Sequence, residues 1–398
     1  MPSATDDSRL PNNKSLLSRT IRTLIKHPTY GALRFDTFRQ AIITPDSNPF
    51  PEHEILNATV WAQSGVAPTN PKIVEYAILW IAHQHRYDSL IEHVEGLPAW
   101  DGVPRLDTWL VDWFAAEDTP FVRLVGRKWL VSAMARALQP GCKVDHTLVL
   151  HGPRQGEGKS EAVKILGLGD RFTREMNRDI NDKDTLIAMQ GTWFGEFPDL
   201  GSLPRSSMNA IKGFLTQTSD AFRPPYGRVT VAHPRRCVFV VTTNDLDFVS
   251  DPSGARRFWP VTVGKRSLDF EKMGMARNQL LAEAYGAHQA LEKWWFSEEV
   301  SFGVEGACEM GMSSLTESVK TAQDELQQGD TWEDRIAGWV QGRNDVTIPK
   351  LLVECLGMAL ADTGKGHQMR AAACLKRLGF NRLLVRVDGP PQRVWRRE

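Results

Sequence analysis

A glycine-rich turn that ends in Lys159 and Ser160 is the part of the sequence best suited to chemistry. It follows the apolar run 147–150 and precedes the helix-like stretch 161–166. In such a turn, glycines let backbone N–H groups converge on phosphate oxygens, and the following helix adds the positive end of its dipole. The lysine supplies a charge for the β- and γ-phosphates, and the serine hydroxyl is a ligand for Mg²⁺. The sequence therefore predicts a site for a nucleoside triphosphate and Mg²⁺.

One position of this turn departs from the usual phosphate loop. Four residues normally separate the first glycine from the Gly-Lys pair, but Pro153 stands at that position and Gly152 precedes it. A chance glycine-rich turn before Lys-Ser is the alternative, and the strand-like and helix-like flanks favour nucleotide binding. The predicted nucleotide-binding residues are Gly152, Arg154, Gln155, Gly156, Glu157, Gly158, Lys159, Ser160 and Glu161.

Two carboxylates, Glu196 and Asp199, stand at the end of the aromatic β-like run 192–197. A phosphate-loop enzyme needs acids that hold Mg²⁺ and orient the attacking water. We predict that Ser160 and Glu196 are metal ligands and that Asp199, with Glu196, polarises water. The alternative is that both acids merely end a strand at the surface.

Polar residues also follow the apolar run 237–241. Asn244 comes after Thr242-Thr243, and its amide is suited to sensing the γ-phosphate; the alternative is an asparagine that turns the chain. The adjacent Arg256 and Arg257 lie in a glycine-bearing loop and suit an arginine finger donated by a neighbouring subunit. Their alternative is a pair of surface arginines, one packed on Trp259. The predicted catalytic residues are Lys159, Glu196, Asp199, Asn244, Arg256 and Arg257.

Two basic segments predict contacts with DNA. Segment 222–236 interleaves arginines with aromatic residues, so cations can contact phosphates while Tyr226 stacks on a base; a solvated loop or an inter-subunit surface is the alternative. Segment 365–398 has nine Lys or Arg residues against two acids. Its pattern predicts a recognition helix over 368–378 and a wing with strands at 383–390 and 394–395; a basic surface that only solubilises the protein is the alternative. The predicted DNA-binding residues are Arg223, Tyr226, Arg228, Arg235, Arg370, Lys376, Arg377 and Arg386, with Arg236 as a further phosphate contact.

Composition excludes several classes of protein. The 398-residue chain has 48 basic and 48 acidic residues, which argues against a surface that binds nucleic acid everywhere. It contains no apolar run of membrane-spanning length, its N-terminus lacks the layout of a signal peptide, and its five cysteines are scattered, so we expect a cytoplasmic protein without disulfides or contact with a membrane. His83 and His85 do not have metal-ligand spacing.

Apolar β-like and helical runs alternate between 147 and 264, which predicts an α/β fold. We predict a P-loop, AAA+-like NTPase core with an N-terminal helical module and a C-terminal winged-helix-like domain. The predicted domains are 1–95 for the helical module, 96–300 for the ATPase domain with a helical lead-in, 301–330 for a linker and 331–398 for the DNA-binding domain.

These motifs together resemble the virulence-associated protein E family, P-loop ATPases related to superfamily 3 helicases. The motifs that carry the resemblance span about 95–300 and comprise Trp100-Asp101-Gly102 with Pro104-Arg105-Leu106, Pro140-Gly141-Cys142-Lys143, Gly152-Pro153 with Gly158-Lys159-Ser160, Phe222-Arg223-Pro224-Pro225-Tyr226-Gly227-Arg228, Thr242-Thr243-Asn244 and Arg256-Arg257-Phe258-Trp259-Pro260. The resemblance implies a homo-hexameric, ATP-driven helicase or translocase that replicates a phage or mobile element. It also implies a single DNA strand inside the ring. Many relatives carry a primase domain ahead of the ATPase, and here a primase would act in trans or not at all.

Two other functions fit the same motifs. The first is an ATP-driven initiator or defence regulator that assembles on DNA without unwinding it. The second is a small-molecule kinase, which predicts activity as a monomer, no stimulation by DNA and no need for Arg256 or Arg257.

Overall fold

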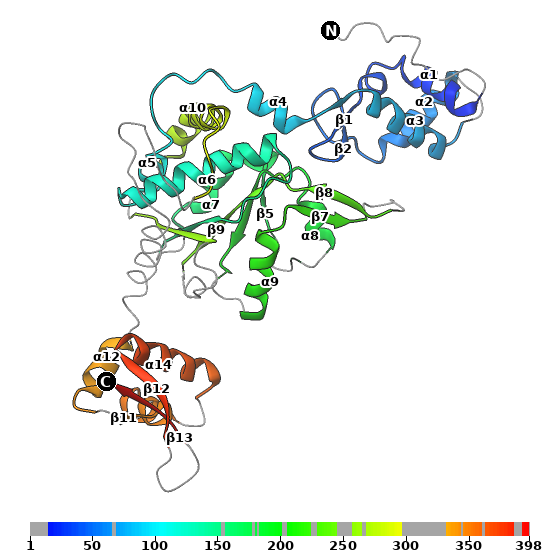
Figure 1. Cartoon of the computed structure of the whole chain (residues 1–398). Helices are drawn as coiled ribbons and strands as arrows, with labels where there is room; N and C mark the ends of the chain where they lie inside the picture. Colours follow the sequence, from blue (N-terminus) through cyan, green and yellow to red (C-terminus); the bar gives the residue numbers. More distant parts are fainter. Residues whose placement is uncertain are drawn as a thin grey trace. The chain divides into compact units, whose positions relative to one another are not determined.

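The chain divides into two compact units, 1–320 and 321–398, in the computed structural model (Figure 1). The finer domain boundaries expected from the sequence stay predictions. Residues described by the structure are 15–65, 69–152, 156–176, 180, 183–200, 205–223, 229–244, 257–264, 268–296, 332–343, 345–359, 363–385 and 392–397. Among them, no helix combines the length and the apolar character that crossing a membrane requires.

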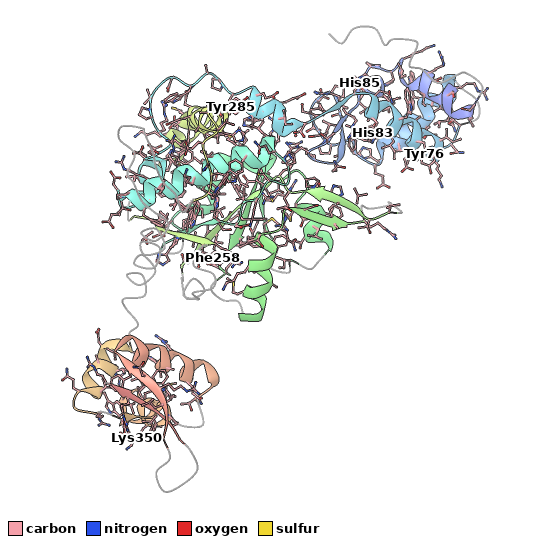
Figure 2. The ribbon with its side chains drawn as sticks, viewed as in Figure 1. Tyr76, His83, His85, Phe258, Tyr285 and Lys350 are labelled. Atoms are coloured by element: carbon pink, nitrogen blue, oxygen red, sulfur yellow. The ribbon has the colours of Figure 1, made fainter. Side chains whose placement is uncertain are left out.

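The first unit begins with helices around a small sheet that the sequence did not predict. Its strands run in the order β2-β1-β3, with β1 antiparallel to β2 and parallel to β3. They are two or three residues long, too short to show the alternation of a strand. His83, labelled in Figure 2, belongs to the N-terminal helices. Its ring stacks on Phe35 of the small sheet with centroids 4.1 Å apart, and burial lowers the pKa of its imidazole. The elements are α1 (Leu16–Leu24), η2 (Tyr30–Ala32), β1 (Arg34–Asp36), β2 (Ala41–Ile43), α2 (Glu54–Gly65), α3 (Pro71–Gln84), β3 (Arg86–Tyr87) and α4 (Ser89–Glu95).

A five-stranded parallel sheet forms the centre of this unit, in the order β10-β4-β9-β6-β5. The prediction of an α/β core is therefore confirmed at this level. All six residues of β9 are buried, as expected for a parallel strand covered on both faces. The elements are α5 (Trp109–Phe114), α6 (Pro120–Leu138), β4 (Thr147–His151), α7 (Lys159–Leu166), η3 (Gly169–Arg171), β5 (Thr173–Glu175), α8 (Lys183–Ala188), β6 (Phe194–Pro198), α9 (Arg205–Leu215), β7 (Ser219–Phe222), β8 (Val231–Pro234), β9 (Val238–Thr243), β10 (Phe258–Thr262) and α10 (Phe270–Gln289).

Helices cover both faces of the sheet (Figure 1). On one face, α6, α7 and α10 share a single apolar core with alternate residues of β4, β6, β9 and β10. Trp129 of α6 donates its indole N–H to the carbonyl of Phe239 at 3.0 Å, which fixes α6 against β9. On the other face, Phe214 of α9 packs on Phe197 and Phe239, with ring centroids 6.3 and 5.7 Å apart.

The turn-rich segment 100–106 is held against α10 by one buried carboxylate. Glu283 of α10 accepts the backbone N–H of Arg105 at 2.6 Å and of Leu106 at 2.9 Å. Within the segment, Arg105 makes two hydrogen bonds of 2.8 Å to Asp101, which lowers the pKa of that carboxyl to about 2. Gly102 has φ +81°, a backbone conformation that glycine adopts without strain.

The second unit packs helices on an antiparallel sheet with strand order β11-β13-β12. Its own apolar core includes Ile336, Leu351, Leu375 and Phe380. The helix predicted over 368–378 is α14, which begins three residues earlier. The elements are α12 (Glu333–Val340), β11 (Asp345–Val346), α13 (Ile348–Lys350), the π-helical turn η6 (Leu351–Cys355), α14 (Lys365–Arg377), β12 (Phe380–Val385) and β13 (Gln392–Arg397).

Replacing Glu283 by alanine should lower the free energy of unfolding by about 3 kcal/mol, because two backbone N–H groups lose their acceptor in a buried setting. Gln279→Ala, one turn earlier on α10, is the control. Gln279 accepts the exposed N–H of Asp101, so its loss should cost less than about 1 kcal/mol. Urea unfolding followed by tryptophan fluorescence measures both. Equal effects of the two substitutions would contradict a structural role for the Glu283 carboxylate.

Candidate functional site

Several of the predicted site residues meet where the parallel strands end, at the carboxyl edge of the sheet. The strands β4, β9 and β6 lie side by side and point the same way, so the segments that follow them emerge together. The turn after β4 starts against β9, because the N–H of Gly152 donates to the carbonyl of Thr243 at 3.1 Å. This edge brings together Lys159, Ser160, Glu196 and Asn244.

The glycines of the turn are required for different structural reasons. Gly156 and Gly158 have φ values of +82° and +78°, which favour glycine. A Cβ on Gly158 would also lie 2.6 Å from the ring of Phe270. Gly152 is limited by space instead, since a Cβ there would lie 1.7 Å from a carboxylate oxygen of Glu157. The predicted Arg154 and Gln155, with Pro153, lie outside the described residues.

Lys159 is the first residue of α7 and is 8% exposed. Its ammonium donates to Oε2 of Glu157 at 3.0 Å and to Oδ1 of Asn244 at 3.0 Å, and reaches the carbonyl of Gly152 at 3.5 Å. The cation therefore lies between the turn and the residue that follows β9. The sequence predicted a polar contact for Asn244 because it directly follows the buried run that forms β9. In the structure its amide oxygen contacts the ammonium of Lys159.

Glu196 is buried on β6 and accepts hydrogen bonds from two hydroxyl groups. Ser160 Oγ lies 2.5 Å from its Oε1, and Thr242 Oγ1 of β9 lies 2.6 Å from the same oxygen. These are hard oxygen donors of the kind that Mg²⁺ prefers. Within the described part of the chain, no cluster of three or more His, Cys, Asp or Glu residues could hold a metal ion. The pair Ser160–Glu196 thus fits an ion that takes its remaining ligands from water and phosphate.

Thr242 is a site residue that the sequence reasoning missed. Its hydroxyl orients the carboxylate of Glu196 from the neighbouring strand. The available signal was its position one residue before the end of β9, at the edge where Asn244 was already expected. A threonine in a buried strand has a structural explanation as a β-branched residue, so its type alone did not indicate a role.

The two other predicted acids of the site are exposed. Asp199 directly follows β6, has φ +48°, and its N–H donates to the carbonyl of Thr242 at 2.8 Å. Its side chain therefore starts from the same edge of the sheet as that of Glu196. Glu161 lies in the first turn of α7, where an acid interacts favourably with the helix dipole.

Arg257 lies at the amino ends of the strands, whereas the phosphate turn follows the carboxyl end of β4. It immediately precedes β10, and its carbonyl accepts the N–H of Thr147 at the start of β4 at 2.7 Å. A five-residue strand is ~15 Å long, so Arg257 is separated by that length from the turn that follows β4. Trp259 is buried, and its ring stacks on that of His146 with centroids 3.8 Å apart. Arg256 lies outside the described residues.

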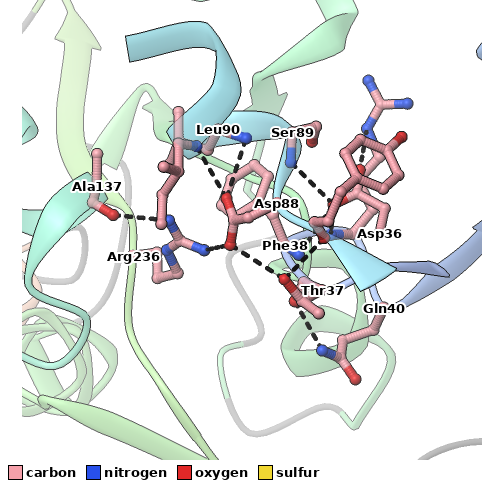
Figure 3. Close-up of polar contacts among 12 residues, drawn as sticks. Asp36, Thr37, Phe38, Gln40, Asp88, Ser89, Leu90, Ala137 and Arg236 are labelled. Carbon is pink, nitrogen blue, oxygen red and sulfur yellow. Dashed lines mark hydrogen bonds and ion pairs between the residues drawn. The ribbon is translucent and has the colours of Figure 1, made fainter. Parts of the chain in front are cut away.

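Two predicted DNA contacts are corrected. Arg235 is 2% exposed; its guanidinium is paired with Asp220 at 2.6 Å and lies 4.0 Å over the ring of Phe214. It is enclosed by these groups and cannot reach a phosphate in this conformation. Arg236 is also largely buried. It donates to Asp88 and to the carbonyl of Ala137, and Figure 3 shows the Asp88 carboxylate between Arg236 and Thr37.

Among the other residues predicted to contact DNA, the structure describes the side chains of only some. Arg223 is exposed directly after β7, and Arg370 is exposed on α14, with its guanidinium 4.3 Å from the centre of the Trp332 ring. Tyr226, Arg228 and Arg386 lie outside the described residues. Lys376 and Arg377 are on α14, and their side chains are not among those described.

Comparison with known structures gives distant similarities. The apo structure of the NrS-1 C terminal region, residues 305–718, has a TM-score of 0.46 at 12% identity, covering 92% of this chain and 96% of that one. Two A form apo structures of the same region have TM-scores of 0.42 and 0.45 at 12% and 11% identity, with the same coverage.

Comparison of sequences is more informative. No curated protein matches the chain. The family model described as the virulence-associated protein E-like domain matches residues 94–305, a stretch of 212 among 398 residues. Because this match spans more than half of its length, the chain belongs to the virulence-associated protein E-like family.

Proposed function

We propose that this protein is an ATP hydrolase that acts on DNA as a helicase or translocase during replication of a phage or mobile element. One observation carries the proposal. Lys159, Ser160, Glu196 and Asn244 come from α7, β6 and the end of β9, and hydrogen bonds join them in two contacting pairs at one edge of the sheet. A cation, a hydroxyl, a carboxylate and an amide at this edge are the groups that phosphoryl transfer needs.

Each residue has a role that follows from its contacts. Lys159 binds the β- and γ-phosphates, and Asn244, which contacts Lys159, positions the γ-phosphate and water. Ser160 and Glu196 hold Mg²⁺, which when bound neutralises charge on the phosphate oxygens. Thr242 keeps the Glu196 carboxylate oriented by its hydrogen bond. Asp199, exposed at the same edge, accepts the proton of the attacking water.

The position of Arg257 favours an oligomer. It lies at the amino end of β10, a strand length from the phosphate turn of its own chain, so a catalytic role for it would be at the site of another subunit. The family resemblance implies a hexameric ring, in which every subunit donates an arginine from 256–257 to its neighbour.

DNA would be contacted by both units. In the first unit, Arg223 and the largely exposed Val229 lie on the β7–β8 hairpin, whose buried base is held by Arg235 and Asp220. In the second, α14 followed by the β12–β13 hairpin has the element order of a winged helix, with Arg370 on the helix. We assign single-stranded DNA to the first surface and duplex DNA to the second.

Glu196→Gln should reduce the rate of ATP hydrolysis at least about 100-fold while nucleotide still binds, because the amide cannot serve as an anionic metal ligand. Thr242→Val should reduce the rate about tenfold by freeing the carboxylate. Thr216→Val is the control, since its hydroxyl bonds only the nearby carbonyl of Gly213 at 2.9 Å. Phosphate release in steady state measures all three. An unchanged rate in Glu196→Gln would remove this residue from the site.

Mixing two inactive variants tests whether the site is shared between subunits. Lys159→Ala subunits keep the arginines, and Arg256/Arg257→Ala subunits keep the phosphate turn. Random assembly should restore hydrolysis at about a quarter of the interfaces. If the mixture stays as inactive as its components, the arginines do not act in trans.

Unwinding is tested with a forked duplex that carries a fluorescent strand. We expect ATP-dependent displacement of that strand, and none with Lys159→Ala. Hydrolysis that DNA stimulates without displacement would contradict helicase activity and favour the initiator or regulator. Hydrolysis by a monomer without any response to DNA would favour the kinase.

A further inference from the structure

Glu157 lies inside the phosphate turn and pairs with the lysine that should bind phosphate. Its Oε2 is 3.0 Å from Nζ of Lys159, and the two side chains are 15% and 9% exposed. A second carboxylate, that of Glu196, is buried at the same edge of the sheet. The charge of Lys159 is therefore paired with the carboxylate of Glu157.

The carboxylate of Glu157 is placed there by the backbone around it. It lies against Gly152, where a Cβ would come within 1.7 Å of Oε2 and 2.9 Å of Lys159 Nζ. The absence of a side chain at Gly152 thus makes room for the ion pair. The glycine that leaves this space is Gly152, which stands one position earlier than the first glycine of the usual phosphate loop.

The same backbone lets the carboxylate leave. Glu157 is flanked by Gly156 and Gly158, and glycine has the widest range of backbone conformations. At Gly156, a Cβ would meet no heavy atom of the described residues within 4 Å. Lys159 would keep its bond to Asn244 at 3.0 Å while Glu157 moves.

We propose that Glu157 is an internal competitor for phosphate that sets the affinity of this site for nucleotides. Its carboxylate occupies Lys159 and is displaced when the β- and γ-phosphates bind. The inference rests on the proposed nucleotide site and adds a residue that opposes binding there. Glu196 differs from Glu157 in that its contacts are to the hydroxyls of Ser160 and Thr242.

Glu157→Gln tests this competition because glutamine keeps the size and a hydrogen-bond acceptor while removing the charge. Calorimetry with Mg²⁺ and the β,γ-imido analogue of ATP should give a dissociation constant five- to tenfold lower, roughly, than that of the wild type. Pyrophosphate should gain affinity by a similar factor, and adenosine should not. Asp170→Asn, an exposed charge removal in η3, is the control and should leave all three constants unchanged.

The outcomes separate the two proposals. If the wild type binds the analogue and Glu157→Gln binds it equally or more weakly, the competitor role is wrong and the nucleotide site stands. Gain for adenosine as well as pyrophosphate would also overturn it, since the effect would not be at the phosphates. If the wild type binds neither the analogue nor pyrophosphate, the proposed function itself fails. Thermal unfolding of both variants shows that the comparison is between folded proteins.

Discussion

The register of three parallel strands determines whether this site exists. Glu196 is paired with Val240, Pro198 with Thr242, and Leu150 with Thr242 across the sheet. Successive side chains of a strand point to opposite faces, so a slip of one residue in β6 would turn Glu196 away from Ser160 and Thr242. Helix α6, fixed by Trp129, and the apolar core it shares with β4 and β9 hold that register. The chemistry therefore depends on backbone pairing before it depends on any charged residue.

Two arginines at the start of β9 are paired with carboxylates of other segments. Arg235 pairs with Asp220, and Arg236 pairs with Asp88 at the start of α4. An unpaired charge in such a setting would cost several kcal/mol, roughly, so these pairs fix how segments meet. The two arginines point to different partners, one within the β7–β8 hairpin and one in the N-terminal helices. Together they fix the base of the hairpin.

The elements that could be predicted were those with a strong local pattern. The fully buried runs of β4 and β9 and the Gly-Lys-Ser turn are visible in the sequence because parallel strands and phosphate turns have characteristic compositions. Strand β5 is only three residues long, and β10 contains Pro260, so neither shows a strand pattern. Arg235 looked like a DNA contact because its partner Asp220 is fifteen residues earlier and comes together with it only in the folded hairpin. The hydrogen bond from the Thr242 hydroxyl to the Glu196 carboxylate likewise exists only because β9 lies next to β6.

Strand β9 joins the two parts of the proposed motor. At its amino end, Arg235 and Arg236 connect the strand to the hairpin and to α4; at its carboxyl end, Thr242 contacts Glu196 and Asn244 contacts Lys159. The strand is buried along its whole length and bonded to β4 and β6 on either side. One core strand therefore connects the base of the hairpin with the two residues that contact Glu196 and Lys159. Because both ends belong to the same paired strand, the register that places Thr242 beside Glu196 also fixes where the hairpin begins.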